Sequence, residues 1–187
     1  MLRVKQISSA HCGPAVVKML LSVYGINVKQ KQIVAVVGAE AKLKTHGMTV
    51  QELGVAVQKL TPQMELWYKT NATIGELAKI IHEYKQPVGV EWQGEFEEYS
   101  DDDNGHYAVA VQVDTVNNVV MLADPFKKYA GKDRWFGVVD FERRWWDTNE
   151  VIDKATGKRW SMKDDQMMFV VVPQGTVWPQ ELGMRRG

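Results

Sequence analysis

The sequence predicts an α+β fold, with helices in its first half and an antiparallel sheet in its second. Up to about residue 86, apolar residues recur at every third or fourth position, which is the period of amphipathic helices. Between residues 87 and 173 they gather in short runs rich in valine and aromatic residues, which are typical of strands. Because helices and strands do not alternate regularly, a parallel doubly wound sheet is disfavoured.

One domain is expected over residues 1–187. A chain of 187 residues, 45% of them hydrophobic and 25% charged, is long enough and apolar enough to bury its own core. We expect a mainly helical half at residues 1–86, a mainly β half at residues 87–173 and a tail at residues 174–187. The tail lacks periodicity, so packing on the surface, binding to a partner and remaining loose all stay open.

The first predicted helix runs from Gly13 to Tyr24. Its apolar residues recur at helical spacing, Pro14 stands in the first turn where proline is tolerated, and Gly25 can end the helix. Cys12 therefore lies at the N-terminus of this helix.

Three more helices are predicted in the first half. Thr49 with Glu52, and Thr73 with Glu76, form capping boxes ahead of apolar runs. A further helix over residues 28–37 is less clearly marked.

Five short apolar runs predict the strands of the second half: residues 87–92, 107–113, 119–123, 135–139 and 168–172. Residues 114–118 predict a hairpin turn between the second and third of them. A short helix is expected over residues 141–146.

The balance of charges excludes nucleic acid as an expected partner. Lysine plus arginine and aspartate plus glutamate number 23 each, so no net field attracts nucleic acid, and no nucleic-acid partner is expected.

No apolar run approaches the roughly 20 residues that span a bilayer, and the N-terminus lacks an export signal. A single cysteine forms no internal disulfide, so we expect a cytoplasmic location. The oligomeric state is left open.

Cys12 is the candidate nucleophile. A helix N-terminus stabilises a thiolate through its unpaired N–H groups and dipole. Among the four histidines, His106 is best placed as general base because it opens a strand after a polar segment. His46 and His82 lie in the helical half and are expected on the surface. On these residues alone, a buried structural thiol at position 12 is an equal alternative.

Asp124, at the end of the next strand, is the candidate to orient the imidazole. It lies directly opposite His106 only in a hairpin register centred on Thr115. A two-residue turn at Asn117 and Asn118 instead puts the two side chains on opposite faces, unless a bulge corrects the register.

Two further sequence features bear on the site. Gln6, six residues before Cys12, can supply a side-chain amide to an oxyanion.

The acidic segment 95–104 precedes His106, and we expect it to be a solvated loop beside the cleft. Calcium binding there is the less favoured alternative. If the segment lines the cleft, its charge favours basic residues in the substrate. No cofactor and no metal site are expected, because the cysteine and histidine spacing offers no zinc pattern.

Four short motifs in order carry a family resemblance: Gln6, Cys12-Gly13-Pro14-Ala15, Gly105-His106-Tyr107 and Ala123-Asp124-Pro125. They resemble those of the bacteriocin-processing, double-glycine-leader cysteine peptidases, which have a papain-like fold. The resemblance runs from about residue 6 to residue 125 and weakly beyond. It implies a helical half packed on an antiparallel sheet, with a peptide or protein as substrate.

By position in these motifs, the resemblance implies four catalytic roles. Cys12 matches the nucleophile, His106 the general base, Asp124 the orienting residue and Gln6 the oxyanion donor. His11 departs from the family pattern, and we expect it to be exposed to solvent. The well-known relatives carry membrane spans and an ATPase module, which this sequence lacks, so a free-standing relative is expected. An acyltransferase, a non-peptide amidase and an inactive peptide-binding module remain alternatives.

Overall fold

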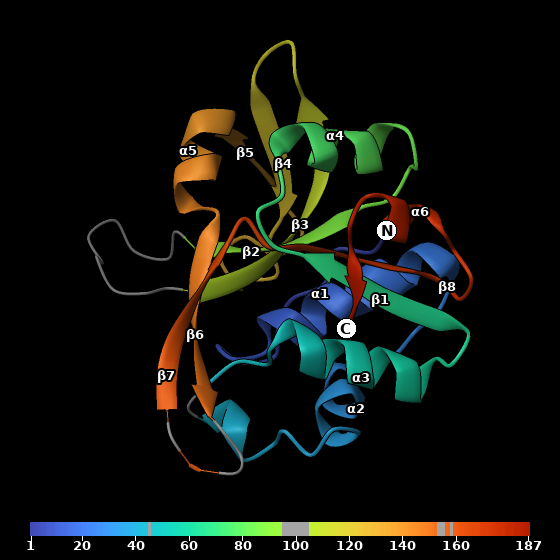
Figure 1. The fold of residues 1–187 in the computed structure, drawn as a ribbon, viewed down its shortest axis with the longest axis vertical. Coiled ribbons are helices and arrows are strands. Elements are labelled where there is room, and N and C mark those ends of the chain that lie inside the picture. The colour runs from blue at the N-terminus through green and yellow to red at the C-terminus, as the bar shows by residue number, and fades with distance from the viewer. Residues whose placement is uncertain (45, 95–104, 153–155, 158) are drawn as a thin grey trace.

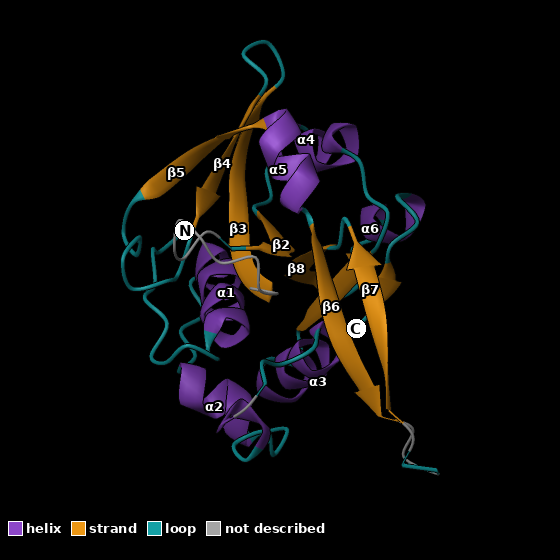
Figure 2. Cartoon of the chain, turned by 90° about the vertical axis from the view of Figure 1, so that its left-hand side faces the viewer, coloured by secondary structure: helices purple, strands orange, loops and turns teal. Residues whose placement is uncertain are grey.

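A seven-stranded antiparallel sheet organises the chain (Figure 1). The computed structural model describes residues 1–44, 46–94, 105–152, 156–157 and 159–187. In spatial order the strands are β5 (Asp133–Gly137), β4 (Val119–Ala123), β3 (Gly105–Asp114), β2 (Val88–Gln93), β8 (Met168–Pro173), β1 (Met64–Lys69) and β9 (Arg185–Arg186). Figure 2 shows a separate two-stranded hairpin of β6 (Trp146–Ile152) and β7 (Arg159–Asp165).

Helices cover both faces of this sheet (Figure 1). Their bounds are α1 (Cys12–Leu21), η1 (Ser22–Tyr24), α2 (Gln30–Ala35), η2 (Lys42–Lys44), α3 (Val50–Leu60), α4 (Ile74–His82), α5 (Val138–Arg144) and α6 (Trp178–Glu181). Alternate residues of β3 enter different cores: Val109 packs with α1 to α3, whereas Ala108 and Ala110 pack with α4 and α5. This period of two places the sheet between two apolar layers.

The capping boxes predicted both helices that follow them. Thr49 and Thr73 each accept a hydrogen bond from the backbone N–H three residues later, and the Glu52 and Glu76 carboxylates accept one from the backbone N–H of the cap residue. The first helix starts one residue earlier than predicted, at Cys12, and continues as η1 to Tyr24. The predicted helix at 28–37 is shorter, at 30–35.

The two halves are less separate than the sequence predicts. Strand β1 comes from the helical half and joins the sheet between β8 and β9. Helix α4, also from that half, packs on the opposite face from α1 to α3. These placements were missed because a long-range partner, not local periodicity, decides which edge or face receives an element.

The β half differs from prediction at three places. The apolar run 135–139 crosses a boundary, because β5 ends at Gly137 and α5 begins at Val138, earlier than the helix predicted at 141–146. Periodicity alone does not separate a short strand from a buried helical turn. The hairpin of β6 and β7 was not predicted, because its residues are mostly polar.

The C-terminal tail is attached to the sheet. Arg185 and Arg186 of β9 pair with β1, and the Gly187 N–H donates to the Leu66 carbonyl at 3.0 Å. A Cβ atom on Gly54 of α3 would lie 2.3 Å from the Gly187 carbonyl carbon. The tail therefore packs on the surface of this sheet and helix, which was one of the three alternatives.

The register between β3 and β4 contains a shift. The turn has four residues, from Thr115 to Asn118, rather than two. The Asp114 carboxylate stabilises it by accepting hydrogen bonds from the backbone N–H groups of residues 116 and 117. Pairing runs regularly from the turn as far as Gln112, then shifts at Val111. Beyond this bulge, Val109 pairs with Ala123.

Gly89 on β2 allows the Phe169 ring of β8 to pack closely against the backbone. A Cβ atom there would lie 2.3 Å from the Phe169 ring, so we expect Gly89→Ala to destabilise the fold by about 1–3 kcal/mol through overpacking. The measurement is the free energy of unfolding in denaturant. Gly75→Ala is the matched control: this glycine is exposed in α4, and alanine should be neutral or stabilising by up to about 1 kcal/mol. Equal effects of the two substitutions would contradict the close packing.

Candidate active site

Cys12 is the first residue of α1, and its thiol is buried. The helix packs on β3, and Gly13 allows a close approach, because a Cβ atom there would lie 3.1 Å from Leu53 and 3.3 Å from Tyr107. The His106 side chain and the backbone N–H groups of Tyr107 and Gly13 lie close enough to the thiol to lower its pKa. The sulfur therefore lies against polar groups as well as hydrocarbon.

His106, the second residue of β3, connects the thiol with Asp124. Its Nε2 lies 2.8 Å from Asp124 Oδ1, and both side chains are almost completely buried. Since Nε2 is engaged by the carboxylate, Nδ1 is the ring nitrogen left for the thiol. Phe126 packs its ring edge-on to the imidazole, with centroids 6.5 Å apart.

The bulge in β3 allows the contact between His106 and Asp124. Without it, the register set by the turn would place Asp124 opposite Val109, on the face away from His106. With the shift at Val111, the register continued past Ala123 brings Asp124 opposite Ala108, on the same face as His106. The two residues are diagonal neighbours rather than directly opposite.

Three groups bind the Asp124 carboxylate. Oδ1 accepts hydrogen bonds from His106 Nε2 and from the Phe126 backbone N–H, at 2.8 Å each. Oδ2 accepts one from Arg134 Nη1 at 3.2 Å. Burial raises the pKa of Asp124, but the hydrogen bond and charge of His106, with the Phe126 N–H and Arg134, outweigh it and hold that pKa below its ordinary value. Asp124 is therefore ionised.

The same contacts set the protonation of Cys12 and His106. Burial raises the pKa of the Cys12 thiol, but the hydrogen bond and charge of His106 and two backbone N–H groups bring it below its ordinary value. Burial lowers the pKa of His106, but hydrogen bonds to Asp124 and Cys12, with their charges, raise it to about 9. The arrangement favours a thiolate beside an imidazolium.

Arg134, on β5, was not identified from the sequence. Its guanidinium lies 3.7 Å from the Tyr129 ring centroid and 4.7 Å from that of Phe136, and it is only 15% exposed. The stacked rings hold the cation against Asp124. No sequence signal separates Arg134 from the other arginines, because its role arises only when β5 pairs with β4.

Gln6 lies beside the site with its amide already bonded. Its backbone N–H donates to the Pro125 carbonyl at 2.9 Å, next to Asp124. Its side-chain Nε2 donates to the Ser8 and Ser9 carbonyls at 2.8 and 3.0 Å. Both amide hydrogens are thus used, while Oε1 is buried without a hydrogen-bond partner among the described residues.

The remaining histidines lie elsewhere. His46 and His82 are exposed, as expected. His11 is half-buried rather than exposed, because its Nδ1 lies 2.5 Å from Ser8 Oγ. Burial, and then the charge of Lys31, lower the pKa of His11, so a neutral ring precedes the thiol. The expectations for the acidic segment 95–104 fall outside the described residues.

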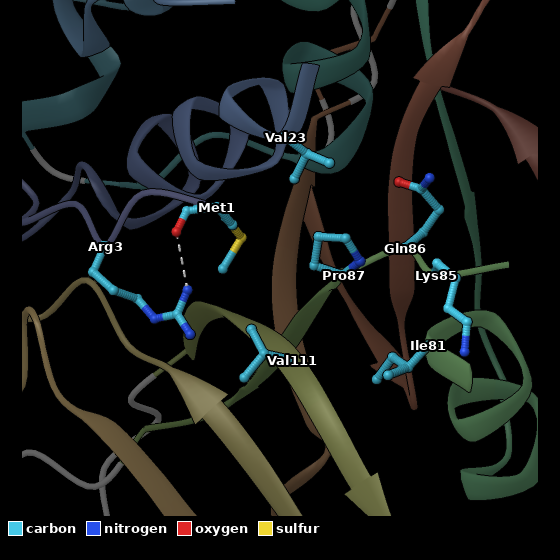
Figure 3. Close-up of a pocket in the computed structure, with 8 residues that line it drawn as sticks. All are labelled: Met1, Arg3, Val23, Ile81, Lys85, Gln86, Pro87 and Val111. Atoms are coloured by element: carbon cyan, nitrogen blue, oxygen red, sulfur yellow. Dashed lines mark hydrogen bonds between the residues drawn. The ribbon is translucent and has the colours of Figure 1, made fainter. Parts of the chain in front are cut away.

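A separate cavity of about 390 Å³ opens beside the N-terminus (Figure 3). Apolar side chains from Met1, Val23, Ile81 and Val111 dominate its lining, together with Arg3 and three residues at 85–87. None of the four predicted site residues lines it. It is therefore separate from the candidate active site.

Comparison with known proteins agrees with this geometry. Residues 2–152 match the model of the Peptidase_C39 like family. The chain belongs to this family. Membership confirms the resemblance to bacteriocin-processing cysteine peptidases found in the sequence, and at the level of the family the chain is a cysteine peptidase that acts on peptides.

A solved structure of similar fold supports the assignment. The peptidase domain of ComA from Streptococcus, a bifunctional ABC transporter involved in a quorum-sensing pathway, superposes with a TM-score of 0.59 at 20% sequence identity. The match covers 91% of this chain and 97% of that domain. It confirms the predicted papain-like α+β fold. A search of curated proteins found no match.

Within the part of the chain that the structure describes, every helix is too short or too polar to cross a bilayer.

The pH dependence of alkylation tests the thiolate. Because the pKa of Cys12 is lowered, iodoacetamide should label it with a midpoint below that of a free cysteine, about 8.5. His106→Ala removes the hydrogen bond and charge and leaves burial, so the midpoint should move upward. Once the midpoint lies above the working pH, each further unit lowers the thiolate fraction, and with it the labelling rate, about tenfold.

Mass spectrometry can follow this labelling without ambiguity, since the chain has a single cysteine. His82→Ala, which removes an exposed histidine, is the matched control and should leave the midpoint unchanged. Coincident midpoints for His106→Ala and the parent would show that His106 does not activate the thiol.

Proposed function

We propose that the chain hydrolyses peptide bonds through Cys12, His106 and Asp124, with Gln6 as an oxyanion donor. The observation that carries this proposal is the placement of the buried thiol beside an imidazole that lowers its pKa and that is itself bonded to a buried carboxylate. A structural thiol needs hydrocarbon around it, whereas this one meets an imidazole whose pKa is raised to about 9. Of the two alternatives for Cys12, the nucleophile is therefore favoured.

The reaction has two stages. The Cys12 thiolate attacks the carbonyl carbon, and the His106 imidazolium gives its proton to the leaving amine as the peptide C–N bond breaks. A water then attacks the thioester with His106 as base, and the S–C bond breaks to release the acid and restore the thiolate. Asp124 keeps the imidazole oriented and stabilises its positive charge throughout.

The oxyanion needs donors beside Cys12. The Cys12 backbone N–H, in the first turn of α1, has no intrahelical partner and is one candidate. The Gln6 amide is the other, and its side chain is buried in the loop that leads to Cys12. Because its amide hydrogens donate to Ser8 and Ser9, binding of the oxyanion requires one hydrogen to pass from a backbone carbonyl to the substrate.

Cys12→Ala should abolish cleavage in a peptide library with little change in the thermal midpoint, because it removes the nucleophile and only one small side chain from the core. Mass spectrometry of new N-termini measures turnover. Cleavage by the variant at the parental rate would exclude the mechanism.

An added amine acceptor extends the same experiment to the alternative reactions. Hydrolysis predicts new N-termini with free acids, whereas an acyltransferase predicts added mass on the acceptor. A parent protein that binds peptides but releases neither product would be a binding module.

Gln6→Ala should lower kcat by about 10²–10³ with little change in KM if Gln6 donates to the oxyanion. Gln30→Ala is the matched control. Gln30 is an equally buried glutamine that braces the same segment, since its amide bonds the Lys5 carbonyl and the Ile7 N–H. Similar losses of kcat in both variants would indicate that Gln6 only braces the loop.

A further inference from the structure

A row of polar side chains joins β2 to the β6–β7 hairpin inside the protein. Glu91 and Gln93 lie on one face of β2, and Asp147 and Asn149 lie on one face of β6. Gln93 Nε2 donates to Asp147 Oδ1 at 3.2 Å, and Asn149 Nδ2 donates to Glu91 Oε2 at 3.5 Å. These side chains therefore form two cross-links between the sheet and the hairpin.

Two members of this row, Glu91 and Asp147, are carboxyl groups that water scarcely reaches, at 2% and 7% exposure. Asp164 of β7 places a third carboxyl group near Glu91. Tyr107 lies directly opposite Glu91 on β3, with its hydroxyl buried. On the other side of β2, the Met167 carbonyl accepts the Glu91 N–H at 3.3 Å. Within the residues that the structure describes, no lysine, arginine or histidine forms an ion pair with Glu91.

These surroundings favour the neutral form of Glu91. A carboxylate that is buried without a cation is costly, because it loses its hydration and gains no opposite charge. Burial raises the pKa of Glu91 well above its ordinary value, the charges of Asp147 and Asp164 raise it further, and Tyr107 lowers it by less. A protonated Glu91 has an O–H that can donate to the Asp147 carboxylate.

The hairpin also contacts the strand that carries His106. A Cβ atom on Gly105 would lie 2.2 Å from Asp147 Oδ1, so the Asp147 carboxylate packs directly on the backbone there. Gly105 pairs with Gln93 and immediately precedes His106 on β3. The position of β6 is therefore coupled to the start of the strand from which the imidazole projects.

We propose that Glu91 is a positioning residue that acts as a neutral acid. Its proton, shared with Asp147, holds the β6–β7 hairpin against the start of β3, and the hairpin leaves the sheet with release of this proton. An ionised Glu91 would be a second negative charge beside Asp147, and opening to water relieves the repulsion. The proposal goes beyond the proposed peptidase function, and its test requires no cleaved peptide.

The pH dependence of stability tests the proton. Glu91→Gln preserves the size of the side chain and a donor group but has no proton to release. The folded parent keeps a proton that the unfolded chain releases above about pH 4.3, so the parent loses stability as the pH rises, whereas the variant does not. Unfolding in denaturant should give a ratio of unfolding constants, variant over parent, that falls about tenfold per pH unit between about pH 5 and pH 7.

Glu76→Gln is the matched control for this measurement, because the Glu76 carboxylate pairs with Lys69 Nζ at 2.6 Å. Glu76 is ionised in the folded and the unfolded protein over the same range of pH, so its ratio of unfolding constants should stay constant. A ratio for Glu91→Gln that stays constant as well, or that rises with pH, would overturn the proposal.

Hydrogen exchange locates the opening. Comparing the parent with Glu91→Gln at the same pH cancels the intrinsic effect of pH on exchange. Amides of β6 and of residues 105–107 should exchange faster in the parent at mildly alkaline pH, before those of α4 exchange, and the difference should shrink toward pH 5. A difference spread equally over β6 and α4 would show that Glu91 affects only global stability, and would reject its positioning role.

A measurement on the parent alone covers the case in which Glu91→Gln does not fold. In infrared spectra, a protonated carboxyl group absorbs separately from carboxylates, and a heavy carbon isotope in the glutamate carboxyls distinguishes them from those of aspartate. A protonated glutamate at neutral pH is the expected result. Its absence would show that Glu91 is ionised in the folded protein and would reject the proposal.

Discussion

The burial of one carboxylate determines the arrangement around the thiol. Asp124 has no exposed side-chain surface, and an ionised carboxylate in that environment requires partners inside the protein. His106, the Phe126 N–H and Arg134 supply them. With the carboxylate ionised, the imidazole beside it retains its proton, and the imidazolium in turn lowers the pKa of Cys12. Asp124 therefore lowers the pKa of Cys12 indirectly, by keeping the imidazole between them protonated.

Strand register makes this arrangement possible. Side chains on a strand alternate between faces, so a shift of one residue moves Asp124 from one face of the sheet to the other. The bulge at Val111 supplies that shift after a four-residue turn fixed by Asp114. The sequence identified the need for a bulge but not its position, because no glycine or other turn residue marks Val111. Long-range pairing with β2 and β4, on either side of β3, fixes it.

The arginines show why part of the site was missed. Arg134 reaches Asp124 because β5 pairs with β4, and it is held there by Tyr129 and Phe136. In the sequence, nothing distinguishes Arg134 from the lysines and arginines that are expected on the surface. Its neighbour on the chain, Trp135, faces the other way and is half exposed. One short strand thus supports Asp124 through Arg134 and exposes the Trp135 ring on its opposite face.

The sequence by itself determined the elements whose causes are local: capping boxes fixed α3 and α4, and apolar runs located β2, β3, β4 and β8. Motif order also selected Gln6, Cys12, His106 and Asp124 as candidate site residues. Tertiary structure decided which faces meet, where β1 and the tail join the sheet, and that Gln6 donates both amide hydrogens to its own loop. The reason is physical: hydrogen bonds and charge pairs between distant residues depend on register and packing, which no local pattern encodes.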